Sequence, residues 1–340
     1  MGIEVLVVDD DPQLRRAIGR ILKIWNYDPI GVPDGLTALK VLKQRNESGN
    51  PLRIILLDLK LPGVDGITVI KNIRSDPSIT YEPYIVVLSA INDKEAILQA
   101  IKEGANDYIT KPFEMDELKV RLEAAKRVLA VELREALIKS LSAITEFKSL
   151  ETGFHIERVQ KFSHLLAEEY MRRKPDRLTP DDVRNIYHAS PLHDIGKVGI
   201  PDRILTKPGK LTPEEFEIMK QHTVIGAEII SRAKKVHPYS PLLDTIYNVV
   251  RYHHEWWDGT GYPDGLRRDE IPIEARIVAV ADVYDAITSQ RVYKPAYPHR
   301  RAVEEIITYS GTQFDPEVVE VFLSLEETFA KIMEEMKDRP

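Results

Sequence analysis

The stretch Ile3-Glu4-Val5-Leu6-Val7-Val8-Asp9-Asp10 decides the fold of the first part of the chain. It is a short, mainly apolar run that ends in two carboxylates, and Leu52–Leu57 and Tyr84–Leu88 are further runs of this kind. Such runs are typical of strands buried on both faces of a parallel sheet, and the amphipathic segments Gln13–Ile24 and Gly35–Lys43 can cover that sheet. We therefore predict an α/β domain over residues 1–125.

Chemically active side chains follow the predicted strands at the point where each strand ends. Because the carboxyl ends of parallel strands meet at one edge of an open sheet, we expect these side chains to lie together. Clustered carboxylates repel one another unless Mg²⁺ or a lysine neutralises them, which predicts a cation site. Asp58 could act there as a nucleophile towards a phosphoryl group, and Ser89 could donate a hydrogen bond to the new phosphate. The residues at the strand ends are Asp9, Asp10, Asp58, Ser89 and Lys111.

A simpler interpretation of the acidic pair is that Asp9 and Asp10 only cap the helix that follows them. It leaves Asp58 and Lys111 at matching strand ends unexplained. Asp58 is followed by Leu61-Pro62-Gly63, and Lys111 is followed by Pro112-Phe113. With these motifs, residues 1–125 resemble the receiver domain of response regulators.

The resemblance implies a flavodoxin-like fold with a five-stranded parallel sheet. It also implies that Asp58 is the phosphoacceptor and that a cognate histidine kinase is its phosphate donor. A Mg²⁺ site and a set of switch residues follow from the same resemblance. The Mg²⁺ ligands would be Asp9, Asp10, Asp58 and the backbone carbonyl of Lys60. The switch residues would be Ser89, Tyr108 and Lys111.

Length and composition predict a soluble protein of two domains, since 340 residues exceed one typical domain. Cysteine is absent, so a bound metal must be held by nitrogen and oxygen donors. The net charge of −7 argues against non-specific binding to a nucleic-acid backbone, and DNA is not an expected partner. No apolar run reaches the roughly 20 residues that span a membrane, and the N-terminus lacks a signal region. We expect a cytoplasmic protein without membrane insertion.

Residues 126–147 are predicted as a linker helix, the second part of a helical segment Met115–Phe147 that contains no glycine or proline. Its apolar residues recur at a spacing of three or four and form one seam. The seam could pack as a surface helix on a neighbouring domain, or it could form a parallel coiled coil. We favour the coiled coil and therefore expect a homodimer. The seam consists of Leu118, Leu122, Ala125, Leu129, Leu133, Leu137, Leu141 and Ile144.

Residues 148–340 lose the strand pattern and are predicted to form an all-α domain, with helices over Ile156–Arg172, Pro180–His193, Pro213–Lys234 and Leu242–His254. Histidine and acidic residues recur through it in doublets and at helical spacing, and these types suit a borderline divalent ion. The candidates are Glu151, His155, His193, Asp194, His222, His253, His254 and Asp282.

Each candidate ligand also has an ordinary explanation when it is taken alone. Glu151 could be a solvated helical charge, and His222 could be a hydrogen-bonded core histidine. Asp282 follows the apolar run Ala275–Ala281 and could be the buried partner of an arginine such as Arg276. The combination with two doublets, however, favours a metal site.

The stretch His253-His254-Glu255-Trp256-Trp257-Asp258-Gly259-Thr260-Gly261-Tyr262-Pro263 places paired histidines before a glycine-spaced turn. Glycines at 259, 261 and 265 let peptide N–H groups approach a ligand closely. Tyr262, on the same turn, could stack on a ring of a ligand or donate a hydrogen bond to it. A structural turn without a ligand is the alternative. With His193-Asp194-Ile195-Gly196-Lys197 and Asp282-Val283-Tyr284-Asp285-Ala286, this stretch resembles the HD-GYP branch of the HD phosphohydrolase superfamily.

That resemblance implies hydrolysis of cyclic di-GMP to pGpG, GMP or both, at two or three Fe or Mn ions, by a metal-bridged hydroxide. It implies that the histidines and Asp282 are ligands, that Asp194 bridges two ions, and that Glu151 permits a third. Asp194 and Lys197 would be the catalytic residues. The substrate would contact Lys197, Gly261, Tyr262, Arg291 and Lys294. Gln290 and Pro295 depart from the family pattern. This departure affects the expected contacts to guanine and not the expected metal ligands.

We therefore predict a phosphorylation-regulated, metal-dependent cyclic di-GMP phosphodiesterase. Two other functions stay open. The protein could be a catalytically weak cyclic di-GMP receptor that acts through partners, such as a GGDEF-type or other signalling protein, that contact the Gly261-Tyr262-Pro263 surface. It could also be an HD hydrolase of another substrate, such as a hybrid cyclic dinucleotide or linear pGpG.

Overall fold

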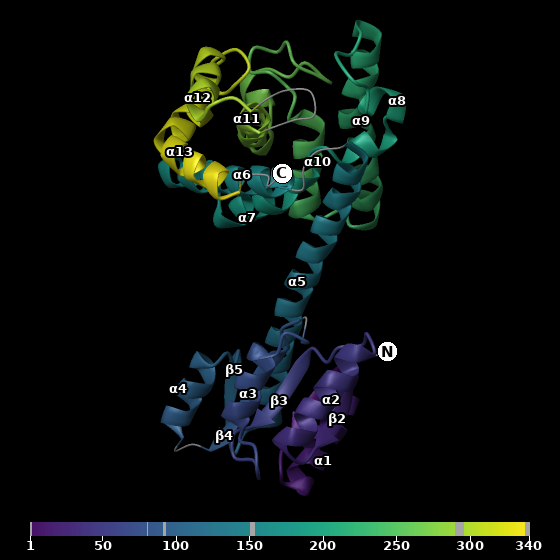
Figure 1. Cartoon of the computed structure of the whole chain (residues 1–340), viewed down its shortest axis with the longest axis vertical. Helices are drawn as coiled ribbons and strands as arrows, with labels where there is room; N and C mark the ends of the chain where they lie inside the picture. The colour runs from purple at the N-terminus through teal and green to yellow at the C-terminus, as the bar shows by residue number, and fades with distance from the viewer. Residues whose placement is uncertain (1, 80, 91–92, 150–153, 290–295, 337–340) are drawn as a thin grey trace. The chain divides into compact units, whose positions relative to one another are not determined.

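The chain forms two compact units, Met1–Leu133 and Arg134–Pro340 (Figure 1). The structure is a computed structural model, and it describes residues 2–79, 81–90, 93–149, 154–289 and 296–336. The first unit, called the receiver unit below, contains the sheet, and the second, called the helical unit, is built of helices. The predicted combination of an α/β domain and an all-α domain is therefore confirmed.

The receiver unit contains one parallel sheet with the strand order β2-β1-β3-β4-β5. This order places β3 at the centre with β1 and β4 on either side, and the apolar runs of these three strands are covered on both faces. The strand order is that of the flavodoxin-like fold expected from the sequence. The strands are β1 (Ile3–Val8), β2 (Tyr27–Val32), β3 (Ile54–Asp58), β4 (Tyr84–Ala90) and β5 (Asp107–Lys111).

Alternate residues of each strand enter different cores, because successive side chains point to opposite faces of a sheet. Val5 and Val7 pack in one core with α1 and the start of α5, whereas Leu6 and Val8 pack in the other core with α2 and α3. Helices α1 and α5 thus cover one face of the sheet, and α2, α3 and α4 cover the other (Figure 1). These helices are α1 (Pro12–Ile24), α2 (Gly35–Glu47), α3 (Gly66–Ser75), α4 (Lys94–Lys102) and α5 (Met115–Ser149).

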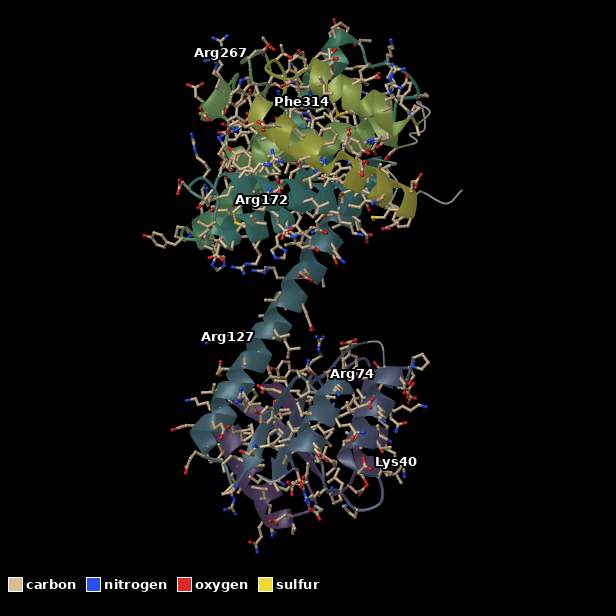
Figure 2. All side chains as sticks on the ribbon, turned by 90° about the vertical axis from the view of Figure 1, so that its left-hand side faces the viewer. Lys40, Arg74, Arg127, Arg172, Arg267 and Phe314 are labelled. Carbon is tan, nitrogen blue, oxygen red and sulfur yellow. The ribbon has the colours of Figure 1, made fainter. Side chains whose placement is uncertain are left out.

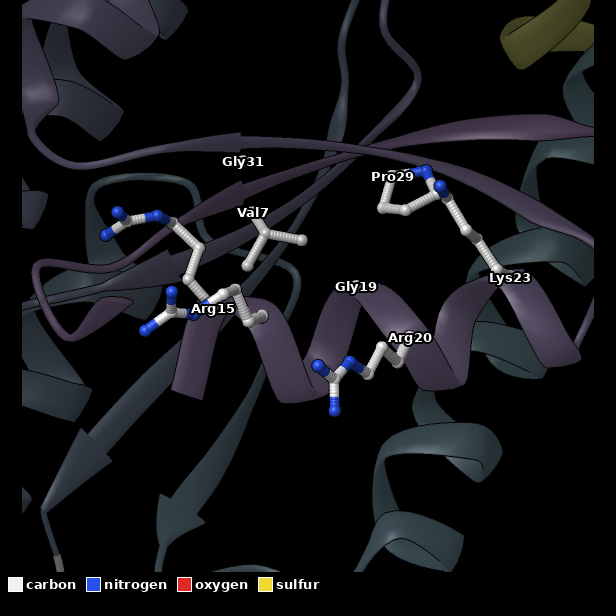
Figure 3. A pocket seen from close by; sticks show the side chains of 8 residues that line it. Val7, Arg15, Gly19, Arg20, Lys23, Pro29 and Gly31 are labelled. Atoms are coloured by element: carbon white, nitrogen blue, oxygen red, sulfur yellow. The ribbon is translucent and has the colours of Figure 1, made fainter. Parts of the chain in front are cut away.

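A basic pocket of about 360 Å³ lies on the receiver unit between α1 and β2 (Figure 3). Gly19 and Gly31 leave room at its base, and none of its four cations forms an ion pair within the part of the chain that the structure describes. A concentrated positive surface therefore exists on a chain whose net charge is −7. The cations are Arg15, Arg16, Arg20 and Lys23.

Helix α5 divides the predicted apolar seam into two parts with different environments. Leu118, Leu122 and Ala125 are fully buried in the core of the receiver unit. The later seam residues are exposed: Leu133, Leu137, Leu141 and Ile144 are 62, 55, 47 and 54% exposed. Ile138, which lies off the seam, enters the core of the helical unit instead.

The helical unit buries an aromatic cluster in which Phe162, Tyr284 and Phe329 contact one another. Phe314, labelled in Figure 2, belongs to the same core and is 2% exposed. None of the described helices is both long and apolar enough to cross a membrane. The elements are α6 (Phe154–Arg173), α7 (Pro180–Ala189), η1 (Ser190–Leu192), η2 (Ile195–Gly199), α8 (Asp202–Leu205), α9 (Pro213–Val236), α10 (Pro241–Tyr252), η3 (Arg268–Glu270), α11 (Ile273–Thr288), α12 (His299–Thr308) and α13 (Pro316–Glu335).

The predicted helix Pro180–His193 was wrong at its C-terminal end, because α7 stops at Ala189. Pro191 has no N–H to donate to the preceding turn, and the chain continues through the short 3₁₀ turns η1 and η2. His193 and Asp194 lie between these turns rather than on a regular helix. The break gives this doublet an orientation that a continuing α7 would not allow.

Candidate metal centre

Five separate segments of the helical unit bring the candidate ligands into one site. His155 lies in the first turn of α6, His222 on α9 and Asp282 on α11. The His193-Asp194 doublet lies between η1 and η2, and the His253-His254 doublet directly follows α10. Seven of the eight candidates therefore converge, and the eighth, Glu151, lies outside the described residues.

The converging side chains form two groups, which meet where His193 of one group faces Asp194 of the other. Asp194, His222, His253 and His254 form one group, and His155, His193 and Asp282 form the other, with ligand atoms within 4.8 Å of one another in each. His193 Nε2 lies 3.2 Å from Asp194 Oδ2 and 3.8 Å from Asp282 Oδ1. The two groups are thus adjacent, which suits a site with more than one ion.

Asp194 is shared between the groups through its two oxygens. Oδ1 lies 3.2 Å from His222 Nε2 and 3.9 Å from His253 Nε2, whereas Oδ2 faces His193. Oδ1 makes no hydrogen bond in the described part of the chain, although it is buried. A buried carboxylate oxygen without a donor is costly, and a cation would satisfy it.

Main-chain carbonyls fix the orientation of three imidazoles. The Nδ1–H groups of His193, His222 and His253 lie 2.8, 2.8 and 2.9 Å from the carbonyl oxygens of Ser190, Met219 and Val249. Only a protonated nitrogen can donate to a carbonyl, so in each neutral ring the lone pair lies on Nε2. The three Nε2 atoms are buried, have no hydrogen-bond partner among the described residues and point into the cluster. This is the arrangement that a metal-ligating histidine requires.

The electrostatics of the site also favour neutral histidines on one side of it. Burial, reinforced by the neighbouring imidazoles, holds the pKa of His253 and of His254 well below the usual value for histidine. Burial likewise lowers the pKa of His222, although Asp194 opposes this effect. Neutral imidazoles are the form that binds metal, so these rings fit the expected group.

His193 has the opposite tendency in the absence of a cation. Burial disfavours its charged form, but Asp194 and Asp282 outweigh burial and raise the pKa of His193 to about 9. In turn, Lys197 and His193 hold the pKa of Asp194 well below its usual range despite burial. A positive charge is therefore strongly favoured between these groups, and a divalent ion would supply it.

Asp285 and Arg158 support the site, and the sequence analysis gave neither of them a role. Asp285 Oδ2 lies 2.7 Å from His155 Nδ1, and both Asp285 oxygens accept hydrogen bonds from the Arg158 guanidinium. Ser289 also donates to Asp285 and accepts from Arg158. All of these groups are buried. Asp285, which Arg158 holds in place, therefore orients His155 in the way that a carboxylate orients a metal-bound histidine.

Gly196 explains why the doublet His193-Asp194 can approach α9. A Cβ atom at position 196 would lie 1.8 Å from the carbonyl oxygen of His222 and 2.5 Å from the nitrogen of Gly226. Only glycine permits this approach of two backbones. The close packing brings Asp194 to His222 across two segments.

Gly261 and Glu255 shape the loop that follows His254. A Cβ atom at position 261 would lie 2.2 Å from the Trp256 nitrogen, so the loop can fold back only with glycine there. The buried Glu255 carboxylate accepts hydrogen bonds from the N–H groups of residues 264–266. This role of Glu255 was missed, because a glutamate next to two histidines gives no sign of a main-chain partner.

The loop places Tyr262 next to His254 of the candidate metal centre. Its ring lies 4.8 Å from the ring of His254 at an interplanar angle of 31°. Burial raises the pKa of Tyr262, and the carboxylates of Asp194 and Asp282 act in the same direction. Tyr262 therefore presents a neutral hydroxyl and a ring face to whatever binds at the cluster.

Lys197 is the other predicted catalytic residue that the structure describes. Its Nζ lies 2.6 Å from Asp194 Oδ2, and its side chain is 14% exposed. The predicted phosphate contacts Arg291 and Lys294, and the departures from the family pattern at Gln290 and Pro295, lie outside the described residues.

The alternative role of Asp282 as an arginine partner does not fit the geometry. Arg276 points instead to Asp315, with Nη1 2.7 Å from its Oδ2. Asp282 faces His155 and His193 at 3.8 Å. The carboxylate is therefore directed into the cluster of imidazoles.

The receiver unit brings its own predicted residues together at the carboxyl edge of the sheet. Asp9, Asp10 and Asp58 form a third group of acidic side chains that could hold an ion. Lys111 Nζ lies 2.7 Å from Asp9 Oδ2 and 2.6 Å from Asp58 Oδ2. The cap of α1 is Asp11, whose side chain accepts from the Gln13 N–H, so capping does not account for Asp9 and Asp10.

The other receiver candidates surround Asp58. The main-chain N–H of Lys60 donates to Asp58 Oδ1, and the Lys60 side chain lies 3.0 Å from Asp93. Ser89 is buried, and its hydroxyl has no hydrogen-bond partner in the described part of the chain. Tyr108, on β5, is 42% exposed. Burial raises the pKa of Asp58, although Lys111 opposes this shift.

The two units define a response regulator that carries an HD domain. The family model of the response regulator receiver domain matches residues 5–123, and that of the HD domain matches residues 148–318. The chain belongs to the family of response regulators that combine these two domains.

Relatives with assigned activities resemble most of the chain. A cyclic di-GMP phosphodiesterase of Thermotoga maritima is 38% identical, over 98% of this chain and 93% of its own length. The cyclic di-GMP phosphodiesterase response regulator RpfG of Xanthomonas campestris pv. campestris is 33% identical, over 95% of this chain and 88% of its own. The 3′3′-cGAMP-specific phosphodiesterase 2 of Vibrio cholerae is 40% identical, over 62% of this chain and 39% of its own.

Proposed function

We propose that the protein is a metal-dependent phosphodiesterase that hydrolyses cyclic di-GMP to pGpG, GMP or both. The observation that carries the proposal is the convergence of seven nitrogen and oxygen donors, three of them buried Nε2 atoms without a hydrogen-bond partner in the described chain. Two relatives that span most of the chain are named for hydrolysis of cyclic di-GMP. The donors support metal-dependent chemistry, and the relatives support a phosphodiester substrate.

The metal ions would be held by His155, His193, Asp194, His222, His253, His254 and Asp282. Bound divalent ions supply a water that is nucleophilic at neutral pH and stabilise negative charge on the phosphodiester. The donor set suits Fe or Mn, and Asp194 can serve two ions because its oxygens face different imidazoles. We propose two such ions, and a third if Glu151 joins the site.

The residues around the ions would bind and orient the phosphodiester. Lys197, held beside Asp194, places an ammonium group where it can stabilise the phosphate and give a proton to the leaving oxygen. Tyr262 offers a neutral hydroxyl and a ring face next to His254. Burial of the histidines excludes bulk water, which strengthens these charge interactions.

A second candidate function is the hydrolysis of a different cyclic dinucleotide. The observation that favours it is the 40% identity to a 3′3′-cGAMP-specific phosphodiesterase over 62% of this chain. The cluster itself binds the phosphodiester, not the base, so it does not distinguish these substrates. A catalytically weak receptor is less well supported, because Lys197 and all seven described ligands are in place.

We also propose that phosphorylation of Asp58 regulates the enzyme. The Asp58 carboxylate neighbours Lys111, and a Mg²⁺ ion held by Asp9, Asp10 and Asp58 would neutralise the entering phosphate. The buried Ser89 hydroxyl would donate to that phosphate, and Tyr108 on the next strand would respond at the surface. A histidine kinase is the proposed phosphate donor.

The exposed part of the α5 seam supports the proposal of a homodimer. Leu133, Leu137, Leu141 and Ile144 recur at three- or four-residue spacing and are each at least 47% exposed. A second copy of the same helix presents the matching apolar stripe, so a parallel coiled coil would bury both. A GGDEF-type protein remains a proposed partner of the Gly261-Tyr262-Pro263 surface.

The decisive test is product analysis. Protein purified without oxygen and loaded with Fe²⁺ or Mn²⁺ is mixed with cyclic di-GMP, and the nucleotides are separated by chromatography. We expect pGpG or GMP, and no product from the His193→Ala/Asp194→Ala variant. His164→Ala is the matched control, since this histidine of α6 is 37% exposed and pairs with Glu168 instead. Unchanged cyclic di-GMP with metal-replete protein, whether or not a phosphoryl mimic is present, would refute the proposal.

A further inference from the structure

Phe216 keeps a large apolar side chain exposed beside the metal centre. It lies in the first turns of α9, the helix that carries His222, and it is 47% exposed. Its ring meets the ring of Tyr262 edge to face, with 6.2 Å between the centroids. Tyr262 in turn lies 4.8 Å from His254. A continuous run of rings therefore leads from a metal-ligand candidate to solvent.

Lys220 adds a cation to this run of rings. It follows Phe216 by four residues on α9, so both side chains lie on the same side of the helix. Lys220 Nζ lies 5.7 Å from the Phe216 ring centroid and 5.6 Å from that of Tyr262. Its ion pair with Glu217 is exposed on one side, since the Glu217 side chain is 68% exposed and the Lys220 side chain is 24% exposed. Such a pair contributes little, so Lys220 can exchange it for a phosphate.

We propose that Phe216, Lys220 and Tyr262 form a base-binding shelf at the mouth of the metal site. The shelf binds the flat face of a purine, and Lys220 contacts a phosphate of the same nucleotide. The proposal rests on the proposed function, because it assigns the substrate a nucleobase.

The physical reason for the shelf is that the metal cluster has no means of recognising a base. Its histidines and carboxylates are directed at one another and at the space between them. Base recognition must therefore come from groups next to the cluster, and aromatic rings that stack on a base supply it. A single exposed phenylalanine needs no explanation, but Phe216 is joined through Tyr262 to a candidate ligand.

Kinetics with two substrates test the shelf. The Phe216→Ala variant is compared with the wild type on cyclic di-GMP and on its abasic analogue, the cyclic ribose phosphodiester that has no bases and therefore no aromatic ring. We expect the KM for cyclic di-GMP to rise roughly fivefold to a hundredfold, the range of stacking on one aromatic ring, with little change in kcat. The variant should hydrolyse the abasic diester as the wild type does. Phe216→Tyr should restore the KM, and Lys220→Gln should raise it.

Ile218→Ala is the matched control, because Ile218 is a 38% exposed apolar residue of the same helix without a ring contact to Tyr262. An unchanged KM in Phe216→Ala would overturn the shelf, as would an equal loss on both substrates. If the wild type hydrolyses no cyclic dinucleotide, the proposed function fails on its own. Equilibrium binding of GMP, which needs no turnover, then decides the shelf: weaker binding by Phe216→Ala supports it, and equal binding overturns it.

Discussion

Replacing Asp285 by asparagine should show how much the helical unit depends on one buried carboxylate. Asp285 is fully buried, and its partner Arg158 is 1% exposed. Burial would raise the pKa of Asp285, but His155 and Arg158 outweigh it and lower that pKa. The substitution removes the carboxylate charge that accepts hydrogen bonds from the buried Arg158 guanidinium through both of its oxygens. Loss of one partner of a buried pair costs roughly 3–5 kcal/mol, which we expect as the loss in the free energy of unfolding.

The same substitution should weaken metal binding by a separate route. Asp285 holds Nδ1 of His155, and loss of such a partner lowers metal affinity by roughly 10- to 100-fold. The double variant Arg158→Met/Asp285→Asn removes both charges. We expect it to regain most of the stability but not the metal affinity, since the Asp285 carboxylate that orients His155 is still absent. This difference separates the two contributions.

Urea unfolding followed by tryptophan fluorescence measures the stability of the helical unit. In a Trp25→Phe background, the remaining tryptophans, Trp256 and Trp257, both lie in that unit. Metal affinity is measured by competition with a chelator. The difference in unfolding free energy between Asp285→Asn and its parent should shrink as the pH falls below about 4. A carboxyl group whose pKa is lowered by folding stabilises the folded state above that pH and loses this effect as it becomes protonated. Equal unfolding midpoints at neutral pH, or a double variant as unstable as the single one, would refute the reasoning.

Three further predictions concern single side chains. Gly196→Ala places a Cβ atom 1.8 Å from the His222 carbonyl oxygen, so it should cost at least about 1–3 kcal/mol and lower the bound metal, measured by thermal unfolding and elemental analysis. Burial and the Glu317 carboxylate raise the pKa of Tyr170 to about 12. The folded state therefore loses stability as the pH rises from about 10 to about 12, and Tyr170→Phe should lose less in urea unfolding across that window. Leu137→Glu changes a 55% exposed seam residue, so the fold should persist while light scattering reports a monomer; a persisting dimer would contradict the coiled coil.

Much of the fold could be predicted because local patterns and burial agree. The run Ile3–Val8 is β1 with the same bounds, and the segment predicted from Met115 begins α5 at that residue. The end of α7 could not be placed by periodicity, because Pro191 changes the hydrogen bonding inside an otherwise helical pattern. The two environments along α5 could not be predicted either, because the spacing of apolar residues does not indicate which of them a core will cover.

The candidate ligands could be predicted because doublets and glycines are visible in the sequence, whereas their supports are not. Arg158 is a charge on α6 that is 127 residues away from Asp285, its partner. Glu255 serves main-chain N–H groups of a loop, which leave no trace in side-chain spacing. Contacts of this kind arise from packing between distant segments, so only the structure assigns them.

The carbonyls of Ser190, Met219 and Val249 have a consequence for how the site can change over generations. A carbonyl of the main chain survives every substitution, so mutation at these three positions does not delete the acceptor that sets each imidazole tautomer. His155 has no such protection, because its Nδ1 contact is the Asp285 side chain, which one nucleotide change can remove. Substitutions at 190, 219 and 249 that preserve the packing should therefore leave each imidazole tautomer unchanged, whereas loss of the carboxylate at 285 should leave the orientation of His155 without its support.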